Sequence, residues 1–480
     1  MKILLTGATG YIGRRLLPVL LAEGHSVVCC VRDKNRFDIS QYNSDRVEVV
    51  EVNFLEKETL KAIPADIEAA YYLIHSMGAK KDFQKLDRIS AENFRDACIA
   101  GGVRRVIYLG GLGSKDTASK HLLSRLETGE ILSASPDKIQ TFWFRAGIII
   151  GSGSASFEII RDLVEKLPVM ITPKWVHTKT QPIGVRDVIE YLARAKDLTA
   201  EKNLVIDIGS ERMSFKEMLE KAGQAMGLKR WLIPVPKLTP HLSSYWLVLM
   251  TPVPFAIARE LVEGLKSETV VQNDHAQTYF PEIVPASFQE TVRGAIEDIE
   301  DSQVLSSWCD TSSGASCELK GREDIADAIF SEEYSVSTEG VPPGKIFSLI
   351  KTLGGKSGWP NTGMAWKLRG LADKILGGPG LSRGRRDPYD LRVGDSLDFW
   401  KVVDIIDGRR LLLLNQMKVP GKAWLEYTLQ DHTLTQKILY RPRGLWGRLY
   451  WLLSKPIHAI IFPLLIAGIV KKARKAAANG

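Results

Sequence analysis

His121 and Arg125 are spaced so that both could take part in the chemistry of a bound ligand. They stand four residues apart in SKHLLSRLETGEIL, residues 119–132, whose pattern is that of a helix, so they share one helix face. An imidazole can donate a proton near neutral pH, and a planar guanidinium can bind a ribose or a phosphate. The alternative for His121 is a purely structural set of hydrogen bonds.

The elements that must position these side chains alternate along residues 1–300. Seven short apolar runs, rich in β-branched and aromatic residues, are separated by amphipathic stretches of helical length. Such runs are typical of parallel strands that are covered on both faces. We therefore predict an α/β fold with a doubly wound parallel sheet, whose ligands bind beyond the C-terminal ends of the strands. The seven runs are 2–6, 26–31, 47–52, 69–74, 104–109, 140–145 and 203–208.

The end of the sixth run adds a third candidate, Arg145, in the segment WFRAG. In a sheet of this kind, that position borders the ligand and its reacting group. The alternative is a simple turn at the end of a strand.

The first run leads into a turn that is suited to a phosphate. In TGATGYIGRRLL, glycines at positions 7, 10 and 13 follow the strand and open an amphipathic helix. Residues without side chains let the backbone approach an anion, and a helix N-terminus presents N–H groups and a positive dipole end. This arrangement predicts dinucleotide binding.

The second run indicates which dinucleotide binds. It ends in VCCVRD, where Val31 and Arg32 replace the acidic residue that usually binds a ribose 2′-hydroxyl. A guanidinium suits a 2′-phosphate, so we predict NADP(H) as the cofactor, in preference to NAD. The alternative is a solvated surface arginine beside Asp33.

Six motifs within residues 1–300 together resemble an atypical, extended short-chain dehydrogenase/reductase of the NmrA-like kind. They are TGATGYIG, VRD, YYLIHSMG, RVIYLGGLG, RAGIIIG and QPIGVRDV. The resemblance implies a Rossmann domain with a small substrate-binding part, and NADP as the usual ligand. It also implies cofactor contacts from Gly7, Gly10, Tyr11, Ile12 and Gly13 at the pyrophosphate, Arg32 at the 2′-phosphate, Asn53 and Phe54 at the adenine, and Leu73, Ile74 and His75 at the ribose.

The same resemblance implies that the usual catalytic residues of the family are replaced in this chain. Catalytic members of the family use a tyrosine, a lysine four residues later, and a serine at the end of the fifth strand. Here His121 and Arg125 take the first two places, and Gly110 and Gly111 take the region of the serine. The resemblance therefore implies either a reductase with different chemistry or a helix that no longer catalyses, and Gly110 becomes a candidate cofactor contact.

A second domain is predicted for residues 331–480, after a Ser/Gly-rich linker at 301–330. Strand-like runs at 395–406, 409–418, 423–430 and 433–442 predict an antiparallel meander, and 445–475 predicts a helix. This order is similar to the α+β helix-grip fold of START-like and polyketide-cyclase-like domains, which implies an apolar ligand cavity. Parts of the segment also resemble a domain of unknown function that is fused to such reductases. Six tryptophans in this domain are candidates for the cavity wall or for packing.

Charge and cysteine content bound the function classes. The net charge of +8 is concentrated in residues 331–480, which hold 24 Lys and Arg against 12 Asp and Glu. No nucleic-acid recognition motif accompanies this charge, so we expect no nucleic-acid partner.

Five cysteines without a CxxC pair argue against a disulfide framework or a zinc site, and we expect no metal. A strand that starts at the first residue leaves no room for a signal peptide, so we expect a cytoplasmic protein.

The apolar run 457–470 raises the question of a membrane. Its 14 residues fall short of the roughly 20 that span a bilayer, which favours a buried helix. The basic tail after it, which includes Lys471 and Lys472, would add attraction to anionic lipid and permit peripheral membrane contact.

These observations favour an enzyme and leave two alternatives open. The first hypothesis is an NADP-dependent oxidoreductase that passes hydride to a hydrophobic carbonyl, enone or quinone, with the second domain receiving or delivering that ligand. The second is a non-catalytic NADP-binding sensor or assembly factor, which the missing catalytic set favours. The third is a lipid-binding or membrane-surface scaffold.

Overall fold

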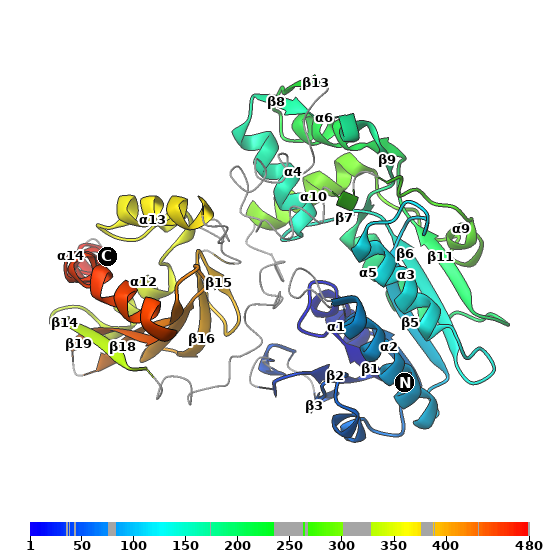
Figure 1. The fold of residues 1–480 in the computed structure, drawn as a ribbon, viewed down its shortest axis with the longest axis horizontal. Coiled ribbons are helices and arrows are strands. Elements are labelled where there is room, and N and C mark those ends of the chain that lie inside the picture. Colours follow the sequence, from blue (N-terminus) through cyan, green and yellow to red (C-terminus); the bar gives the residue numbers. More distant parts are fainter. Residues whose placement is uncertain are drawn as a thin grey trace. The chain divides into compact units, whose positions relative to one another are not determined.

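A computed structural model gives the structure of the chain in two compact parts (Figure 1). The described residues up to 300 form the first unit, and those from 328 onward form the second. The predicted linker, 301–330, lies almost wholly outside the described residues. These are 1–34, 37, 39–42, 45–74, 83–172, 174–234, 263–264, 267–300, 328–375, 387, 389–430 and 432–478.

The first unit is built on a seven-stranded sheet in which every neighbouring pair of strands is parallel. The strand order is β11-β6-β5-β4-β1-β2-β3, so the chain crosses from the β3 edge back to β4, which lies beside β1. The prediction of a doubly wound parallel sheet is confirmed. The strands are β1 (Lys2–Thr6), β2 (Ser26–Val31), β3 (Val47–Glu51), β4 (Ala69–Tyr72), β5 (Arg105–Gly111), β6 (Gln140–Ala146) and β11 (Leu204–Ile208).

Helices cover both faces of this sheet because its strands are apolar on both sides. Ile3 and Leu5 of β1 belong to one hydrophobic core, together with residues of α1 (Gly13–Ala22), α5 (Val185–Ala195) and α9 (His275–Tyr279). Leu4, between them, belongs to a second core with α2 (Phe83–Ala100) and α3 (Lys120–Leu132). Alternate residues of a strand point to opposite faces, which explains the division.

Shorter elements in the later part of the first unit surround α4, α6 and α10. Ser154 caps α4 by accepting a hydrogen bond from the N–H of Phe157, and Ser214 and Glu217 form a capping box at the start of α6. Helix α6 packs against both α4 and α10. The elements of this later part are β7 (Ile149–Ile150), α4 (Ala155–Lys166), β8 (Val169–Thr172), η4 (Lys174–His177, a 3-10 helix), β9 (Lys179–Thr180), β10 (Ile183–Gly184), β12 (Met213–Ser214), α6 (Phe215–Ala225), β13 (Trp231–Pro234) and α10 (Phe288–Glu300). Two further 3-10 helices, η2 (Ile39–Tyr42) and η3 (Lys57–Ala62), lie earlier in the chain, on either side of β3.

The second unit contains a six-stranded antiparallel sheet of order β14-β19-β18-β17-β16-β15. The predicted meander is confirmed, and the first strand of the unit pairs along its whole length with the last. The terminal helix α14 packs on β14, β19 and α12. The elements are β14 (Phe330–Ser337), α12 (Pro343–Lys351), η6 (Gly355–Ser357), α13 (Gly363–Ile375), β15 (Ser396–Leu397), β16 (Trp400–Ile406), β17 (Arg410–Asn415), β18 (Gly421–Gln430), β19 (Thr433–Pro442) and α14 (Gly444–Ala478).

Aromatic side chains form much of the core of the second unit. The ring of Trp366 in α13 lies 5.1 Å from that of Phe399 and 6.0 Å from that of Phe462 in α14. Five of the six tryptophans that the sequence singles out are buried, and Trp446, which is 76% exposed, is the exception. Packing in the core therefore accounts for five of the six tryptophans, which is one of the two roles that the sequence leaves open for them.

Candidate functional site

The turn between β1 and α1 can be formed only with glycine at two positions. Gly7 has a left-handed φ of 68°, and a Cβ there would lie 2.7 Å from the carbonyl oxygen of Leu73. A Cβ on Gly13 would lie 2.3 Å from the carbonyl oxygen of Gly7. The N-cap residue Ile12 makes no side-chain cap hydrogen bond, and the positive end of the α1 dipole lies at this turn, which suits an anion. Gly10 closes the turn by donating its N–H to the carbonyl of Gly7 at 2.8 Å.

Tyr11 and Arg15 fasten this turn to the loop that precedes α4. The Tyr11 hydroxyl and the Arg15 guanidinium both donate to the carbonyl of Ser152, at 3.1 and 2.7 Å. The guanidinium carbon lies 4.0 Å from the centre of the Tyr11 ring. Burial raises the pKa of Tyr11 to about 12, so its phenol stays neutral and keeps its proton for Ser152. The side chain of Tyr11 thus positions the turn, and its backbone carbonyl accepts a 3.2 Å hydrogen bond from Arg15, so its contact with the cofactor stays a prediction.

The ends of β2 and β3 lie at the same edge of the sheet, because Val31 pairs with Glu51. Arg32 follows β2 and is exposed. The amide of Asn53 is committed to its own turn, since it donates to Glu56 at 2.6 Å and accepts from the N–H of Leu55 at 3.2 Å. Arg32 is thus exposed at this edge of the sheet, and the structure uses the Asn53 side chain locally.

Phe54 and the end of β4 are fixed mainly through backbone and core contacts. Phe54 is buried edge-on against Phe94, with ring centres 5.6 Å apart, and its carbonyl accepts a 2.7 Å hydrogen bond from Asn93. The N–H of Leu73 donates to the hydroxyl of Thr6 at 3.1 Å, which holds Leu73 beside the turn at Gly7. Ile74 follows it directly, whereas His75 lies outside the described residues.

Arg125 lies at the C-terminal end of β5, where its guanidinium Nε does not donate a hydrogen bond to any of the described residues. A Cβ on Gly111, the last residue of β5, would come within 3.7 Å of its guanidinium. Its Nε is buried and has no hydrogen-bond partner among the described residues. Its backbone carbonyl accepts a 2.9 Å hydrogen bond from the hydroxyl of Tyr108 in β5, which fixes helix α3 to the strand. A buried unsatisfied donor is costly, so this position suits a polar ligand atom.

Gly110 is required by packing. A Cβ there would lie 2.5 Å from Nε1 of Trp143, and a Cβ on Gly129 of α3 would meet the same indole at 2.2 Å. The two glycines make room for Trp143 between β5, β6 and α3. This packing explains the glycine without a cofactor, so the contact between Gly110 and the cofactor stays a prediction.

His121 stacks flat on Phe83. The ring centres are 4.2 Å apart and the planes differ by 4°. Helix α3 begins one residue earlier, and α2 begins at Phe83, so the stack joins the first turns of two helices. This contact favours the structural alternative for His121, and its catalytic role remains a prediction.

Arg145 is engaged by a carboxylate on the neighbouring strand. Its Nε and Nη2 donate to the two carboxylate oxygens of Asp207, at 2.6 and 2.9 Å. Asp207 is 1% exposed and also accepts from the N–H of Gln272 at 2.8 Å. The geometry favours a structural ion pair for Arg145. A charged residue within the apolar run NLVIDI was the available signal for this pair.

Glu158 is a titratable group near the β1–α1 turn that sequence reasoning did not single out. It lies in the first turn of α4, after Ser154, and its carboxylate pairs with Arg161 at 2.5 Å. Burial raises the pKa of Glu158 to about 6, and the charge of Arg161 opposes that rise. Its charge in turn helps to raise the pKa of Tyr11, so the two groups are electrostatically coupled. Among the described residues, no three His, Cys, Asp or Glu side chains gather as metal ligands would.

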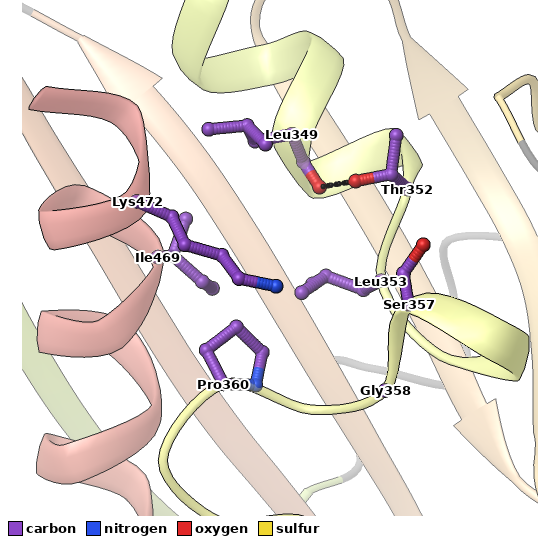
Figure 2. A pocket seen from close by; sticks show the side chains of 8 residues that line it. All are labelled: Leu349, Thr352, Leu353, Ser357, Gly358, Pro360, Ile469 and Lys472. Carbon is purple, nitrogen blue, oxygen red and sulfur yellow. Dashed lines mark hydrogen bonds between the residues drawn. The ribbon is translucent and has the colours of Figure 1, made fainter. Parts of the chain in front are cut away.

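The second unit has a small depression on its surface. Figure 2 shows Ile469 and Lys472 of α14 on one side of it, and Leu349 of α12 with Thr352 on the other. The Thr352 hydroxyl donates to the carbonyl of Leu349 at 2.8 Å. Its space of about 230 Å³ includes open solvent, so it is a depression of the surface and not an enclosed cavity. A hydrophobic ligand in this domain stays a prediction.

Comparison with known proteins matches the two units separately. A family described as NAD(P)H-binding matches residues 7–138, and the protein of unknown function family DUF2867 matches residues 325–465. The photosystem II assembly factor Ycf39 of Guillardia theta is 21% identical over 243 residues, which cover 49% of this chain and 74% of that protein.

Solved structures resemble the first unit in fold. Triphenylmethane reductase of Citrobacter sp., complexed with NADP(H), has a TM-score of 0.50 and 17% identity, with 62% of this chain and 100% of that chain covered. UDP-glucose 4-epimerase of Thermotoga maritima, with UDP-glucose, has a TM-score of 0.49 and 13% identity, with 63% and 100% covered. At these identities, the likeness concerns the fold alone.

Proposed function

We propose that this chain, which combines an NAD(P)-binding domain of the NmrA-like short-chain dehydrogenase/reductase type with a separate DUF2867 domain, is an NADP(H)-dependent reductase. Its acceptor is a hydrophobic carbonyl, enone or quinone. The observation that carries the proposal is the buried Arg125 Nε, an unsatisfied donor at the end of β5.

The residues at the sheet edge fit a dinucleotide that carries an extra phosphate. The turn at Gly7 and Gly13 has no space for a Cβ, and the positive dipole end of α1 lies at this turn, where a pyrophosphate would be stabilised. Arg32 is exposed after β2, where a 2′-phosphate would be held. When bound, NADPH supplies the hydride.

Arg125 would then orient the acceptor or the cofactor ribose. Its free Nε can donate to an oxygen atom at the end of β5, and a charged donor there stabilises negative charge that develops on that oxygen. A quinone or an enone relaxes the need for a dedicated acid, because water can supply the proton after reduction. This supports an acceptor of that kind in a site where His121 is stacked on Phe83 and Arg145 is paired with Asp207.

NADPH oxidation by the full-length protein with a panel of quinones, enones and aldehydes tests this function. We expect Arg125→Ala to slow turnover by about ten- to a hundredfold, the loss that follows from removing one hydrogen bond to a charged donor. Arg88→Ala, which removes an exposed ion pair with Glu127 on the neighbouring helices, is the matched control and should turn over normally. A turnover rate that Arg125→Ala leaves unchanged would contradict the role of Arg125.

A non-catalytic NADP(H)-binding sensor or assembly factor is the second candidate. The His121–Phe83 stack and the Arg145–Asp207 pair support it, because both remove candidate catalytic groups. The 21% identical relative is named as an assembly factor, which supports it further. Tight binding of NADPH with no oxidation by any acceptor in the panel would favour this candidate over the reductase.

A further inference from the structure

Helix α14 of the second unit carries a row of exposed apolar side chains along its first half. Six large residues in this row are each at least 56% exposed. We call them the outward row: Leu445, Trp446, Leu452, Leu453, Ile457 and Ile460. An exposed set of this size on one helix is unusual in a protein that stands alone in water.

The opposite side of α14 accounts for its place in the fold. Trp451, Phe462, Leu465 and Ile469 are buried at helical spacing in the core of the second unit. Helix α14 also packs on β14 and β19. The core therefore needs only one side of this helix, and packing within the unit does not explain the outward row.

The charge of α14 identifies the chemistry of its partner. Residues 444–478 contain no Asp or Glu, whereas they hold six basic residues. Four of these, Lys471, Lys472, Arg474 and Lys475, form the last turns of the helix, beyond the outward row. Trp446, at the other end, is of the type that favours a membrane–water interface. An apolar row with a basic end complements a surface that is apolar inside and anionic outside.

The same charges disfavour a second copy of the chain as the partner. In a two-fold symmetric dimer, the same surface meets itself, and α14 has no acidic side chain that could pair with the basic side chains of a second copy. Like charges without partners at such an interface are repulsive.

Helix α14 is long enough to cross a bilayer, since residues Leu445–Ala476 have the necessary length and hydropathy. The uncharged stretch between Lys455 and Lys471 has 15 residues, fewer than the roughly 20 that a hydrocarbon core requires. A spanning helix would also withdraw Leu465 and Ile469 from the core of the unit. These two facts favour a helix that lies along the surface.

We propose that α14 binds an anionic membrane surface, with its axis in the plane of the membrane. The outward row enters the boundary of the acyl chains, and the basic end contacts the anionic headgroups. The buried side of the helix keeps its place on the sheet, so the domain docks without unfolding. This inference does not depend on the proposed reductase activity, because none of its residues belongs to the nucleotide site.

Flotation of the full-length protein with vesicles tests the proposal. We expect binding to vesicles of phosphatidylcholine mixed with phosphatidylserine, and weaker binding to phosphatidylcholine alone or at high salt. Leu453→Asp should weaken binding by about tenfold or more, because it removes an apolar side chain from the buried surface and adds a negative charge. Val284→Asp, at an 83% exposed valine of the first unit, is the matched control and should float like the wild type.

A second variant probes the electrostatic part separately. Lys471→Glu combined with Lys475→Glu should abolish the preference for phosphatidylserine, with an unchanged circular dichroism spectrum and unchanged urea unfolding as signs of intact folding. Equal flotation of the wild type and Leu453→Asp would overturn the proposal. A wild-type dimer in sedimentation that Leu453→Asp dissociates, with no vesicle binding, would overturn it in favour of self-association.

Discussion

Arg145 and Asp207 face each other across neighbouring strands β6 and β11 and share two hydrogen bonds, of 2.6 and 2.9 Å. The carboxylate is almost completely buried, so the pair is part of the interior of the first unit. The sequence predicts a catalytic candidate at position 145, whereas in the structure the guanidinium of Arg145 is hydrogen-bonded to the Asp207 carboxylate. A catalytic role and a structural role for Arg145 predict different effects when Arg145 is mutated.

Arg145→Ala should act on stability before it acts on turnover. The substitution leaves the Asp207 carboxylate buried without its partner, which typically costs about 3–5 kcal/mol. Urea unfolding followed by circular dichroism measures this cost. Arg145→Ala combined with Asp207→Ala should recover part of the loss, since no buried charge is then unpaired. Unchanged unfolding with lost turnover would instead support the catalytic candidate.

Gly7→Ala should impair nucleotide binding through the shape of the turn. Gly7 and Gly102 have nearly the same left-handed φ, 68° and 69°, so alanine costs about 1–2 kcal/mol of backbone strain at each. Only at Gly7 does the added Cβ meet the backbone, at the Leu73 carbonyl. Calorimetric titration should show at least about tenfold weaker NADPH binding for Gly7→Ala, whereas Gly102→Ala binds normally. Equal effects of the two variants would show that crowding at Leu73 is irrelevant.

Glu158 should make the stability of the first unit depend on pH. Burial raises its folded-state pKa from 4.5 to about 6, so the folded protein keeps a proton that the unfolded chain releases. This contribution is fully present below pH 4.5 and is lost as the pH rises through 6. The shift corresponds to about 2 kcal/mol.

Glu158→Gln should remove that dependence. The variant should gain about 2 kcal/mol relative to the wild type between pH 4.5 and 7.5 in urea unfolding. Glu165→Gln, which removes an exposed carboxyl from the same helix, is the matched control. If wild type and Glu158→Gln keep the same difference at both pH values, the carboxyl does not titrate in this range.

The positions of the strands could be predicted because each parallel strand is an apolar run bounded by turn residues. All seven runs in the first unit form strands of one sheet, and the glycine turn stands where the sequence places it. The four runs near the end of the chain likewise give the antiparallel meander. Local patterns suffice for these elements, since hydrophobic periodicity reports burial directly.

The candidate site was less predictable because its contacts join distant residues. Two helices bring Phe83 and His121 together, and a glycine is needed at position 110 because the indole of Trp143 leaves no space for a Cβ there. Neither relation has a signal in local sequence. Composition likewise cannot tell Trp446, which is exposed, from tryptophans such as Trp451, which lie in the core. His75 lies outside the described residues, so its predicted contact with the ribose stays a prediction.

Nucleotide binding at the first crossover is the central claim, and titration of the purified full-length protein with NADPH and NADH tests it most directly. We predict that NADPH binds more tightly than NADH, and that Arg32→Ala weakens NADPH by about tenfold or more while it leaves NADH nearly unchanged, because only NADPH offers a 2′-phosphate to the guanidinium. If neither nucleotide binds the wild-type protein, in reduced or oxidised form, the account is contradicted.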